Sequence, residues 1–585
     1  MVESSVPSPH LPQDHLPPAA PGGPENPQYR DRVARLEKWR AAGVEPYGGR
    51  VDGLATAAEA RGLHKGVDVT PHDGGERAKV AGRIVLYRDI GKLIFLTIQD
   101  WTGRIQVGLA KQYFPDKWPQ AKLLELGDIA WFEGKVGHTK TGEVTIWADG
   151  LGILSKALLP PPDKFHGLHD TETRYRQRYV DLFANPDSMD VFLFRCRMID
   201  SIRDFLKGRR FVEVETPMMQ AIAGGAAARP FITHHNALDI DLFLRISPEL
   251  YLKRLMVGGM ERVFEINRNF RNEGIDTTHN PEFTMMEVYQ AYSDLAGMME
   301  LTESLFVRLA RERVAAMNKP ADGPLHLQFG ERILDFTPPF ERLSYAAHFK
   351  EKVGVEMTDA AAVRRVAAEQ GIDAAAKEHD VVVGELFERL AEPALAAHDR
   401  PVFVYDYPAA LCPLTRRKPG VPGIAERFEL YVAGMELANA YTELNDPMVQ
   451  EETFGKQLAG QKEEDSMAKM DEDFINALRH GMPPAGGLGI GIDRLAMVLT
   501  NRVSIRDVVL FPLLKPAAAE EGVGGAKVTA KAPGSGPNFA EVDEEQMEKD
   551  VAKFETEMAR VKQIAPVRPM MFILNADGSL RIFEV

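Results

Sequence analysis

Apolar and polar positions follow two different periods along the chain. Between about residues 80 and 159, short runs alternate with period two, and turns that contain Gly and Asp separate them. These runs predict five β-strands at Arg83–Tyr87, Leu93–Gln99, Arg104–Leu109, Ile129–Val136 and Val144–Trp147. Elsewhere apolar residues recur at helical spacing, and this pattern predicts helices at Tyr29–Ala42, Val191–Arg209, Ala360–Ala368 and Val382–Leu395.

The five predicted strands fit a small barrel of the oligonucleotide-binding type. Such barrels hold single-stranded nucleic acid by stacking bases on exposed aromatic side chains beside a basic groove. Arg88 and Phe95 are candidates for that groove. The alternative is that Phe95, which stands in an apolar run, belongs to the barrel core. A slight excess of Lys and Arg between Lys79 and Lys156 favours an anionic partner for this segment.

The stretch Glu265–Tyr289 predicts a strand, a polar loop and a second strand. Arg271 and Glu273 are two residues apart and are expected on one face of the first strand, as are Glu287 and Tyr289 on the second. An arginine, carboxylates and an aromatic ring on one strand pair predict a site for a charged ligand. The alternative is an amphipathic hairpin with a solvated polar face.

Composition narrows the class of protein. The length of 585 residues indicates several domains, and a hydrophobic fraction of 44% is sufficient for sizeable cores. We find no run of about twenty apolar residues and no apolar N-terminal signal, so we expect neither a membrane span nor secretion. Two cysteines and a net charge of −15 fit a cytoplasmic protein without indiscriminate affinity for nucleic acid.

Three further patterns occur in a fixed order. The helix at Val191–Arg209 leads into a strand at Phe211–Glu215 that ends at Pro217, the strand pair at Glu265–Tyr289 follows, and a Gly-rich strand then runs into Asp493 and Arg494. In this order the chain resembles the class II aminoacyl-tRNA synthetases. Within the class it is similar to the lysyl-tRNA synthetase family, through the runs Arg174–Tyr179, Gly224–Phe231 and Glu249–Lys253. The similarity extends from about residue 29 to about residue 516.

This resemblance implies an α+β multidomain fold. An N-terminal barrel of the oligonucleotide-binding type would precede a catalytic domain with an antiparallel sheet flanked by helices. We expect the following organisation: a disordered N-terminal extension over residues 1–27, a helical segment over 28–78, the anticodon-binding barrel over 79–159, the catalytic domain over 160–516 with a helical insertion at about 343–398, a linker over 517–540, and a C-terminal extension of open role over 541–585. In the extension a helix at Glu541–Lys562 and a hairpin of Met570–Leu574 with Ser579–Val585 are expected.

The chemistry that the resemblance implies is the activation of lysine by ATP and the transfer of lysine to tRNA. Neither step requires a protein nucleophile, so positioning and cations aimed at developing negative charge should carry catalysis. Arg271 and Arg494 match the family's catalytic arginines. The ATP site would consist of these two arginines with Glu273, His279 and Phe283, and Glu429 with Glu436 would hold magnesium on the phosphates.

Lysine carries an ammonium group at each end, so its pocket requires carboxylates at both ends. By resemblance, Gly225 and Glu249 would bind the α-amine, and Glu287, Tyr289 and Glu443 would bind the ε-amine. The substrate carboxylate would meet Arg271 and Asn439. For tRNA, the matching anticodon positions on the barrel are Arg88, Phe95, Gln106 and Glu143. The family also implies a homodimer, with the apolar helix at Val191–Arg209 at the interface.

Three alternatives remain at this point. A paralogue that attaches lysine to a protein or a lipid is disfavoured, because the known protein-modifying paralogues lack the barrel and a lipid-modifying one would need a membrane domain. A regulatory protein with an inactive catalytic domain is disfavoured because Arg271, Glu273, Glu436 and Arg494 are all in place. An aspartyl-type enzyme would need a cationic or amide-reading pocket.

Overall fold

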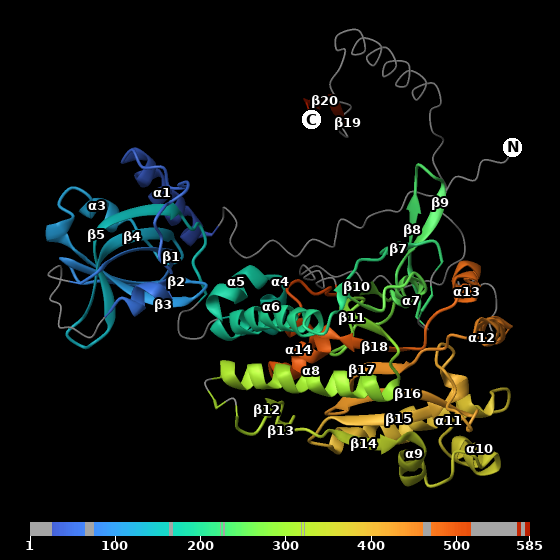
Figure 1. Cartoon of the computed structure of the whole chain (residues 1–585). Helices are drawn as coiled ribbons and strands as arrows, with labels where there is room; N and C mark the ends of the chain where they lie inside the picture. Colours follow the sequence, from blue (N-terminus) through green and yellow to red (C-terminus); the bar gives the residue numbers. More distant parts are fainter. Residues whose placement is uncertain are drawn as a thin grey trace, which may run out of the picture. The chain divides into compact units, whose positions relative to one another are not determined.

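The computed structural model describes residues 26–64, 75–162, 168–222, 224–225, 228–317, 319–320, 322–459, 470–515, 570–574 and 580–584. All five predicted barrel strands are confirmed, and they close into a barrel in the order β1-β2-β3-β5-β4 (Figure 1). Each strand is longer than its alternating run predicts. Their bounds are β1 (Arg77–Asp89), β2 (Leu93–Asp100), β3 (Gly103–Ala110), β4 (Ile129–His138) and β5 (Val144–Ser155).

The N-terminal helical segment packs on this barrel. Helix α1 (Pro27–Ala41) begins at the cap Asn26, whose side chain accepts a hydrogen bond from the Gln28 amide. Trp39 of α1 and two alanines of α2 (Ala57–Gly62) are part of the barrel core. Arg32 is buried and donates to the carbonyl oxygens of Leu126 and Ala157 at 2.9 and 3.0 Å. Arg32 therefore anchors α1 to the barrel.

The catalytic domain is built on an eight-stranded sheet in the order β14-β15-β16-β17-β18-β11-β10-β6. Strands pair in antiparallel fashion except at the two edges, where β14 pairs with β15 and β6 with β10 in parallel. The predicted antiparallel sheet is therefore confirmed in its centre and mixed at its edges. The bounds are β6 (Val212–Glu213), β10 (Arg262–Phe270), β11 (Glu282–Ala291), β14 (Glu341–Ser344), β15 (Val402–Pro408), β16 (Ile424–Val432), β17 (Met435–Thr442) and β18 (Ala485–Gly491).

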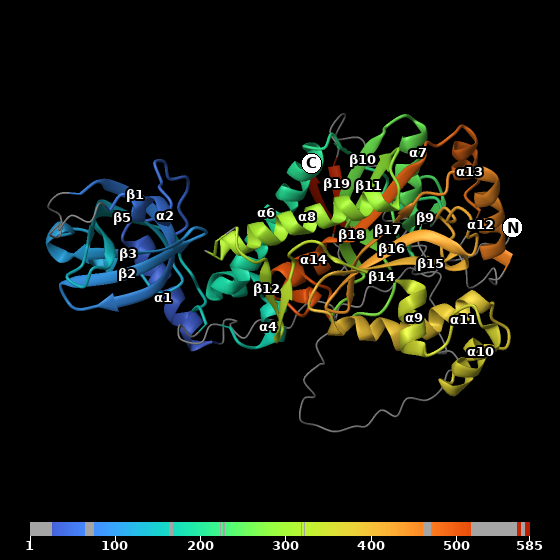
Figure 2. The same ribbon diagram turned by 60° about the horizontal axis from the view of Figure 1, so that its bottom comes forward.

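One face of this sheet is covered by three helices. These are α6 (Pro186–Lys207), α8 (Leu295–Ala316) and α14 (Ile492–Leu499), and α6 and α8 run side by side in both ribbon views (Figures 1 and 2). Side chains of β11, β17 and β18 alternate along each strand, and every second one enters the core beneath these helices. The residues between them face the opposite side, where described helices pack at the two ends of the sheet.

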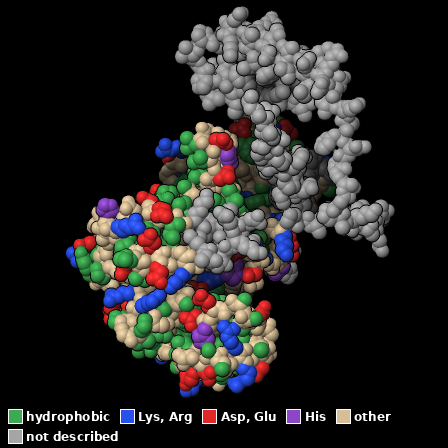
Figure 3. Space-filling model, turned by 90° about the vertical axis from the view of Figure 1, so that its right-hand side faces the viewer, with side chains coloured by type: hydrophobic (Ala, Val, Ile, Leu, Met, Phe, Trp, Pro, Cys, Tyr) green, Lys and Arg blue, Asp and Glu red, His purple; other side chains and the backbone are tan. Residues whose placement is uncertain are grey.

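At one end of that opposite face lie α7 (Glu249–Val257) and α13 (Glu472–Arg479), which share a core with β10 and β11. At the other end lies the predicted helical insertion, packed on β15 and β16. The insertion contains α9 (Tyr345–Val353), α10 (Ala360–Glu369) and α11 (His379–Leu386). On the side shown in Figure 3, acidic and basic side chains are interspersed with hydrophobic ones.

The helix predicted at Val382–Leu395 is confirmed as a regular α-helix only as far as Leu386. Helix α11 ends at Leu386, and a π-turn at Phe387–Ala391 and a 3-10 turn at Glu392–Ala397 follow it. Pro393 stands within this run, where it cannot donate a backbone hydrogen bond, and a tighter turn takes the place of a regular helix.

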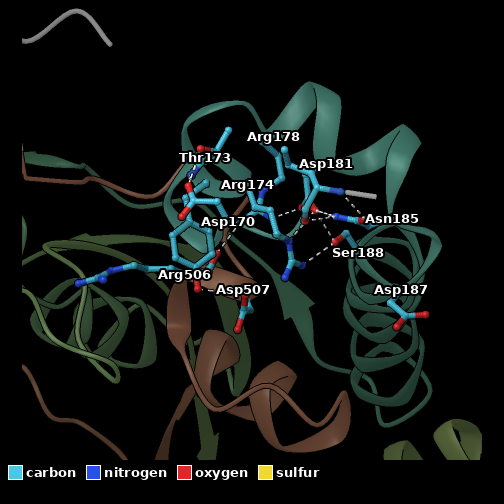
Figure 4. Close-up of polar contacts among 12 residues, drawn as sticks. Asp170, Thr173, Arg174, Arg178, Asp181, Asn185, Asp187, Ser188, Arg506 and Asp507 are labelled. Atoms are coloured by element: carbon cyan, nitrogen blue, oxygen red, sulfur yellow. Dashed lines mark hydrogen bonds and ion pairs between the residues drawn. The ribbon is translucent and has the colours of Figure 1, made fainter. Parts of the chain in front are cut away.

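A buried polar cluster joins the start of the catalytic domain to its end. Asp181 of α5 (Arg178–Ala184) accepts from Arg174, Arg178, Asn185 and Ser188, as Figure 4 shows. The Arg178 guanidinium also donates to the carbonyl oxygens of Arg506 and Leu510. The run Arg174–Tyr179, which carries part of the family resemblance, therefore binds the backbone near the end of the domain through Arg178.

The apolar side chains of α6, among them Val191, Phe194, Met198, Ile202 and Phe205, lie in the core of this same chain. The apolar excess of the helix is thus accounted for without a second copy, and the dimer interface stays a prediction. No helix in the described ranges is long and apolar enough to cross a membrane.

The chain divides into two units, Met1–Ala517 and Ala518–Val585. In the second unit β19 (Met570–Leu574) and β20 (Leu580–Glu584) pair in antiparallel fashion, which confirms the two strands of the predicted hairpin. The predicted disordered N-terminal extension (apart from residues 26 and 27), the linker and the helix at Glu541–Lys562 lie outside the described residues.

Candidate active site

On the face of the sheet opposite α6, α8 and α14, Gly487 and Gly489 give β18 a strip without side chains, which we call the β18 trough. The Gly-rich strand lies between β11 and β17, and its register places Gly489 between Glu287 and Asn439, and Gly487 between Tyr289 and Tyr441. A side chain at Gly487 would meet neighbouring atoms at once, because a Cβ there would lie 1.8 Å from Glu443 Oε1. The glycines therefore leave room into which the polar side chains of both flanking strands project.

Arg271 and Glu273 lie just beyond the sheet. The prediction that they share a face of the first strand is wrong, because β10 ends at Phe270. The Arg271 amide still donates to the Pro281 carbonyl at 2.9 Å, so the loop begins as a continuation of the strand pair. Burial lowers the pKa of Arg271, and the carboxylates of Glu273, Glu436 and Glu287 oppose that shift. Arg271 is thus a desolvated cation among acids, suited to an anionic group.

The Arg271 guanidinium stacks over the ring of Phe283 at 5.2 Å from its centroid. Its Nε is buried without a hydrogen-bond partner among the described residues. An unpaired donor on a buried guanidinium is costly unless a ligand accepts from it. The pair therefore offers a flat cationic surface with free hydrogen-bonding capacity.

Arg494, in the first turn of α14, holds the loop that carries His279. Its Nη2 lies 2.9 Å from His279 Nε2, and its Nη1 donates to the Glu436 carbonyl at 2.9 Å. Because a guanidinium can only donate, Nε2 must accept and the imidazole proton stands on Nδ1, 2.8 Å from Asp276 Oδ2. The structure therefore brings Arg494 and His279 together as the resemblance implies.

The residues predicted to bind lysine include Glu287, which is buried on β11. Its two oxygens accept from the Ser247 hydroxyl at 2.7 Å and from the Tyr289 hydroxyl at 2.9 Å. Burial, and then the neighbouring Glu249, raises the pKa of Glu287 to about 7. The shared face predicted for Glu287 and Tyr289 is confirmed.

A second group of polar side chains consists of Glu249, Glu443 and Tyr441. The Tyr441 hydroxyl donates to Glu249 Oε1 at 2.5 Å, and both glutamates are buried. Gly225 adopts a φ of +86°, and a Cβ there would approach Ser247 and Glu249 at 3.2 and 3.4 Å. A residue with free access to this conformation and no side chain is what the position requires. The structure thus brings the residues predicted for the two amines close together.

Glu429 and Glu436 are the candidates for a metal. Glu429 on β16 accepts from the Tyr407 and Tyr431 hydroxyls at 2.7 and 2.6 Å and pairs with Arg427. Burial, and then the charge of Glu429, raises the pKa of Glu436 to about 7, which a cation beside both carboxylates would reverse.

The carboxylates of Glu429 and Glu436 fit magnesium only if a bound phosphate compound and water supply further oxygens. In the described part of the chain, no group of three or more His, Cys, Asp or Glu side chains could hold a metal ion. Two carboxylates leave most of an octahedral shell to other oxygens, such as those of phosphates and water. Asn439 lies beside the pair, and its Oδ1 accepts from Arg427 Nε at 3.1 Å.

Comparison with known proteins adds the family. Residues 170–515 match the family described as tRNA synthetases class II (D, K and N), and residues 78–154 match the OB-fold nucleic acid binding domain. The lysine–tRNA ligase of Pelotomaculum thermopropionicum is 48% identical over 495 residues, which are 83% of this chain and 94% of that protein. The chain belongs to the lysine–tRNA ligases. The ligases of Carboxydothermus hydrogenoformans and Magnetococcus marinus are each 47% identical, over 83% and 84% of this chain and 97% of their own lengths.

In this ligase the predicted anticodon residues share the outer face of the barrel. Arg88 on β1 pairs directly with Phe95 on β2, and Phe95 meets the Trp147 ring edge-on at 5.8 Å. Phe95 is half-buried on this outer face, whereas its neighbours Ile94 and Leu96 fill the core. The core alternative for Phe95 is therefore wrong.

The other two positions flank that pair. Gln106 on β3 donates to the Thr145 hydroxyl at 2.8 Å, and Glu143 at the start of β5 lies 3.4 Å from Arg61 of α2. Both side chains already contact other residues of the ligase. A nucleotide base would therefore have to replace these contacts or bind in addition to them.

Sequence reasoning on the ligase missed the residues that hold the site in place. Asp493 accepts from the Thr284 amide at 2.7 Å and pairs with Arg195 at 2.6 Å, which fixes the start of α14 against β11. Lys253, one turn after Glu249, belongs to the run Glu249–Lys253 that carries the family resemblance. Its helical spacing of four from a predicted pocket carboxylate was the available signal.

Proposed function

We propose that the trough along β18 and the loop beyond β10 form the site of lysine activation. Lysine and ATP react there to give lysyl-adenylate and pyrophosphate, and the lysyl group then passes to the 3′ end of a lysine-accepting tRNA. We further propose that the enzyme acts in the cytoplasm as a homodimer with α6 at the interface. The observation that carries the proposal is the pocket of Glu249, Glu287 and Glu443 beside Arg271.

In the first step the lysine carboxylate attacks the α-phosphate of ATP. Glu249 and the Gly225 carbonyl hold the α-amine, and Glu287, Tyr289 and Glu443 hold the ε-amine. Arg271, with its unpaired Nε, binds the reacting carboxylate and the α-phosphate together. Positioning and a desolvated cation aimed at developing charge supply the rate enhancement, and no covalent intermediate with the enzyme forms.

The adenine ring occupies the space between Phe283 and Arg494, and Glu273 accepts from its amino group. For the ring to stack on Phe283, the Arg271 guanidinium must turn from that ring toward the phosphates. His279 and Arg494 reach the outer phosphates, and their mutual contact holds the loop ready for them.

Glu429 and Glu436 would hold magnesium. When bound, the metal would supply positive charge beside the phosphates. Arg427 and the two tyrosine hydroxyls keep the Glu429 carboxylate in a fixed orientation.

In the second step the terminal ribose hydroxyl of tRNA attacks the adenylate carbonyl. The barrel binds the anticodon at a distance from the chemistry: Phe95 stacks on a base, while Arg88, Gln106 and Glu143 contact the backbone or read base edges. Its contacts govern which tRNA is charged and leave the first step untouched.

An aspartate- or asparagine-specific enzyme is disfavoured by the same pocket. Three buried carboxylates would repel an acidic side chain and leave charges unpaired around an amide.

The test is ATP–pyrophosphate exchange by the whole chain with each amino acid separately, followed by charging of purified tRNA. Exchange with lysine alone, followed by charging of its tRNA, is the expected result. Exchange with aspartate or with no amino acid would refute the proposal.

A further inference from the structure

A lysine of the chain itself stands inside the proposed amino-acid pocket. Lys253 projects from α7, and its side chain is 0% exposed. Its ammonium lies 2.7 Å from Glu249 Oε1 and 2.5 Å from Glu443 Oε2, and 5.5 Å from the centroid of the Tyr441 ring. Lys253 therefore bridges a carboxylate assigned to the α-amine and one assigned to the ε-amine.

This bridge changes the charge of the pocket. Glu249, Glu287 and Glu443 together carry three negative charges when ionised, whereas a lysine substrate brings two ammonium groups. With Lys253 present, the pocket has a surplus of two negative charges, which equals what the substrate supplies. Without it, one buried carboxylate would stay uncompensated after lysine had bound, and burying such a charge is strongly unfavourable.

We propose that Lys253 is a positioning residue of the amino-acid pocket: a permanent counter-ion that orients Glu249 and Glu443 and fits the charge of the pocket to a diamino acid. The inference rests on the proposed function, because it takes these glutamates as the lysine-binding groups. Lys253 acts through them and touches neither reacting atom.

The contacts separate this role from that of a simple core ion pair. Lys253 takes only Oε2 of Glu443, and Oε1 points at the trough over Gly487, buried and without a hydrogen-bond partner among the described residues. Both Lys253 and the Tyr441 hydroxyl meet Oε1 of Glu249. Each glutamate is thus held by one oxygen and keeps the other for a ligand.

The electrostatic shifts agree with that geometry. Burial lowers the pKa of Lys253, but Glu249 and Glu443 outweigh it, so the ammonium stays charged. Burial raises the pKa of Glu443 to about 8, and Lys253 opposes this rise. Loss of the Lys253 charge would therefore raise this pKa further and favour the protonated carboxyl, which attracts an ammonium group less strongly.

The test compares Lys253→Met with a matched control, Lys156→Met, in the full chain. Lys156 lies in the barrel, is likewise 0% exposed, and pairs with Glu125 and Asp128 at 2.7 and 2.8 Å. Both substitutions remove a buried ammonium from between two carboxylates, so both should lower the melting temperature. Only one of them lies in the proposed pocket.

In ATP–pyrophosphate exchange, Lys253→Met should raise the KM for lysine by at least about tenfold, the order expected for loss of one buried charge partner. The KM for ATP should not change, and Lys156→Met should change neither KM. A lysine KM in Lys253→Met equal to that of the unsubstituted enzyme would overturn the inference, as would an equal rise in both variants.

If Lys253→Met does not fold, the double variant Lys253→Met/Glu443→Gln leaves neither charge of that pair unpaired and is compared with Glu443→Gln. A higher lysine KM in the double variant is expected because Glu249 has lost its cation, and an equal KM would overturn the inference. Failure of the unsubstituted chain to exchange with lysine would instead refute the proposed function.

Discussion

A methyl group added at Gly487 should damage lysine binding chiefly through a clash with Glu443. The Cβ of Gly487→Ala would lie 1.8 Å from Glu443 Oε1 and 2.8 Å from Tyr289 Cε1. Real Cβ atoms do not approach other atoms closer than 3.0 Å, so the carboxylate oxygen must move by about 1.2 Å. Glu443 is buried and is held on its other side by Lys253, so this movement would strain that ion pair.

The expected size follows from this displacement. A misplacement of about 1 Å in a positioned group costs on the order of 100-fold, or about 2.7 kcal/mol. Because only one of several lysine-binding groups moves, we expect the KM for lysine to rise by about 10- to 100-fold. The KM for ATP should stay constant, since Arg494 and Phe283 lie outside the range of this contact.

The assay is lysine-dependent ATP–pyrophosphate exchange, with Gly486→Ala as the control. Gly486 is the neighbour on the same strand but faces the helical side, where a Cβ would lie 2.8 Å from Met298 Cγ. Both variants overpack the protein and should lose about 1–3 kcal/mol of stability, but only Gly487→Ala should lose lysine affinity. Equal lysine KM values in the two variants would refute the placement of the pocket.

Three further outcomes are expected. The pKa of Glu287 is raised to about 7 and that of Glu443 to about 8 in the empty pocket, so at lower pH these carboxyls bind protons that incoming ammonium groups must displace. The KM for lysine should therefore rise as the pH falls from 8 to 6. Glu287→Gln should weaken this dependence while it impairs lysine use more than ATP use. A pH-independent lysine KM would contradict the assignment. Glu436→Gln should raise the magnesium concentration needed for half-maximal exchange and leave the KM for lysine unchanged, whereas a lysine-selective defect would count against a metal role. Phe95→Ala should raise the KM for tRNA in charging by about 10- to 100-fold, in line with about 1–3 kcal/mol per stacked base, without any effect on exchange; a defect in exchange would show that the residue matters for folding instead.

The barrel was predictable because its strands are short, alternating and separated by turn residues. The strand pair and the Gly-rich strand were equally predictable. Their core residues alternate with the polar and glycine positions of the site, as at Met286, Val288, Leu488 and Ile490. Period two decides the face of a strand residue from the sequence alone. The pairing of Gly487 with Tyr289 and Tyr441 could not be read, because it depends on strands far apart in the chain.

The sequence pattern predicted the wrong environment for residues whose surroundings depend on tertiary packing. The alternation at Arg271 and Glu273 continues past Phe270, but the strand stops there and the loop takes over. The burial of Lys253 could not be predicted from the sequence, because a lysine in a helix is ordinarily exposed to solvent. Only the packing of α7 against the sheet reveals that it is fully buried between two carboxylates.

The most direct test of the central claim is a crystal structure of the full chain with lysine and a non-hydrolysable ATP analogue. The account predicts the ε-ammonium within hydrogen-bonding distance of Glu287, Tyr289 and Glu443, and the α-ammonium at Glu249 and the Gly225 carbonyl. Lysine bound away from the β18 trough, or with its amines at neither pair of carboxylates, would contradict it.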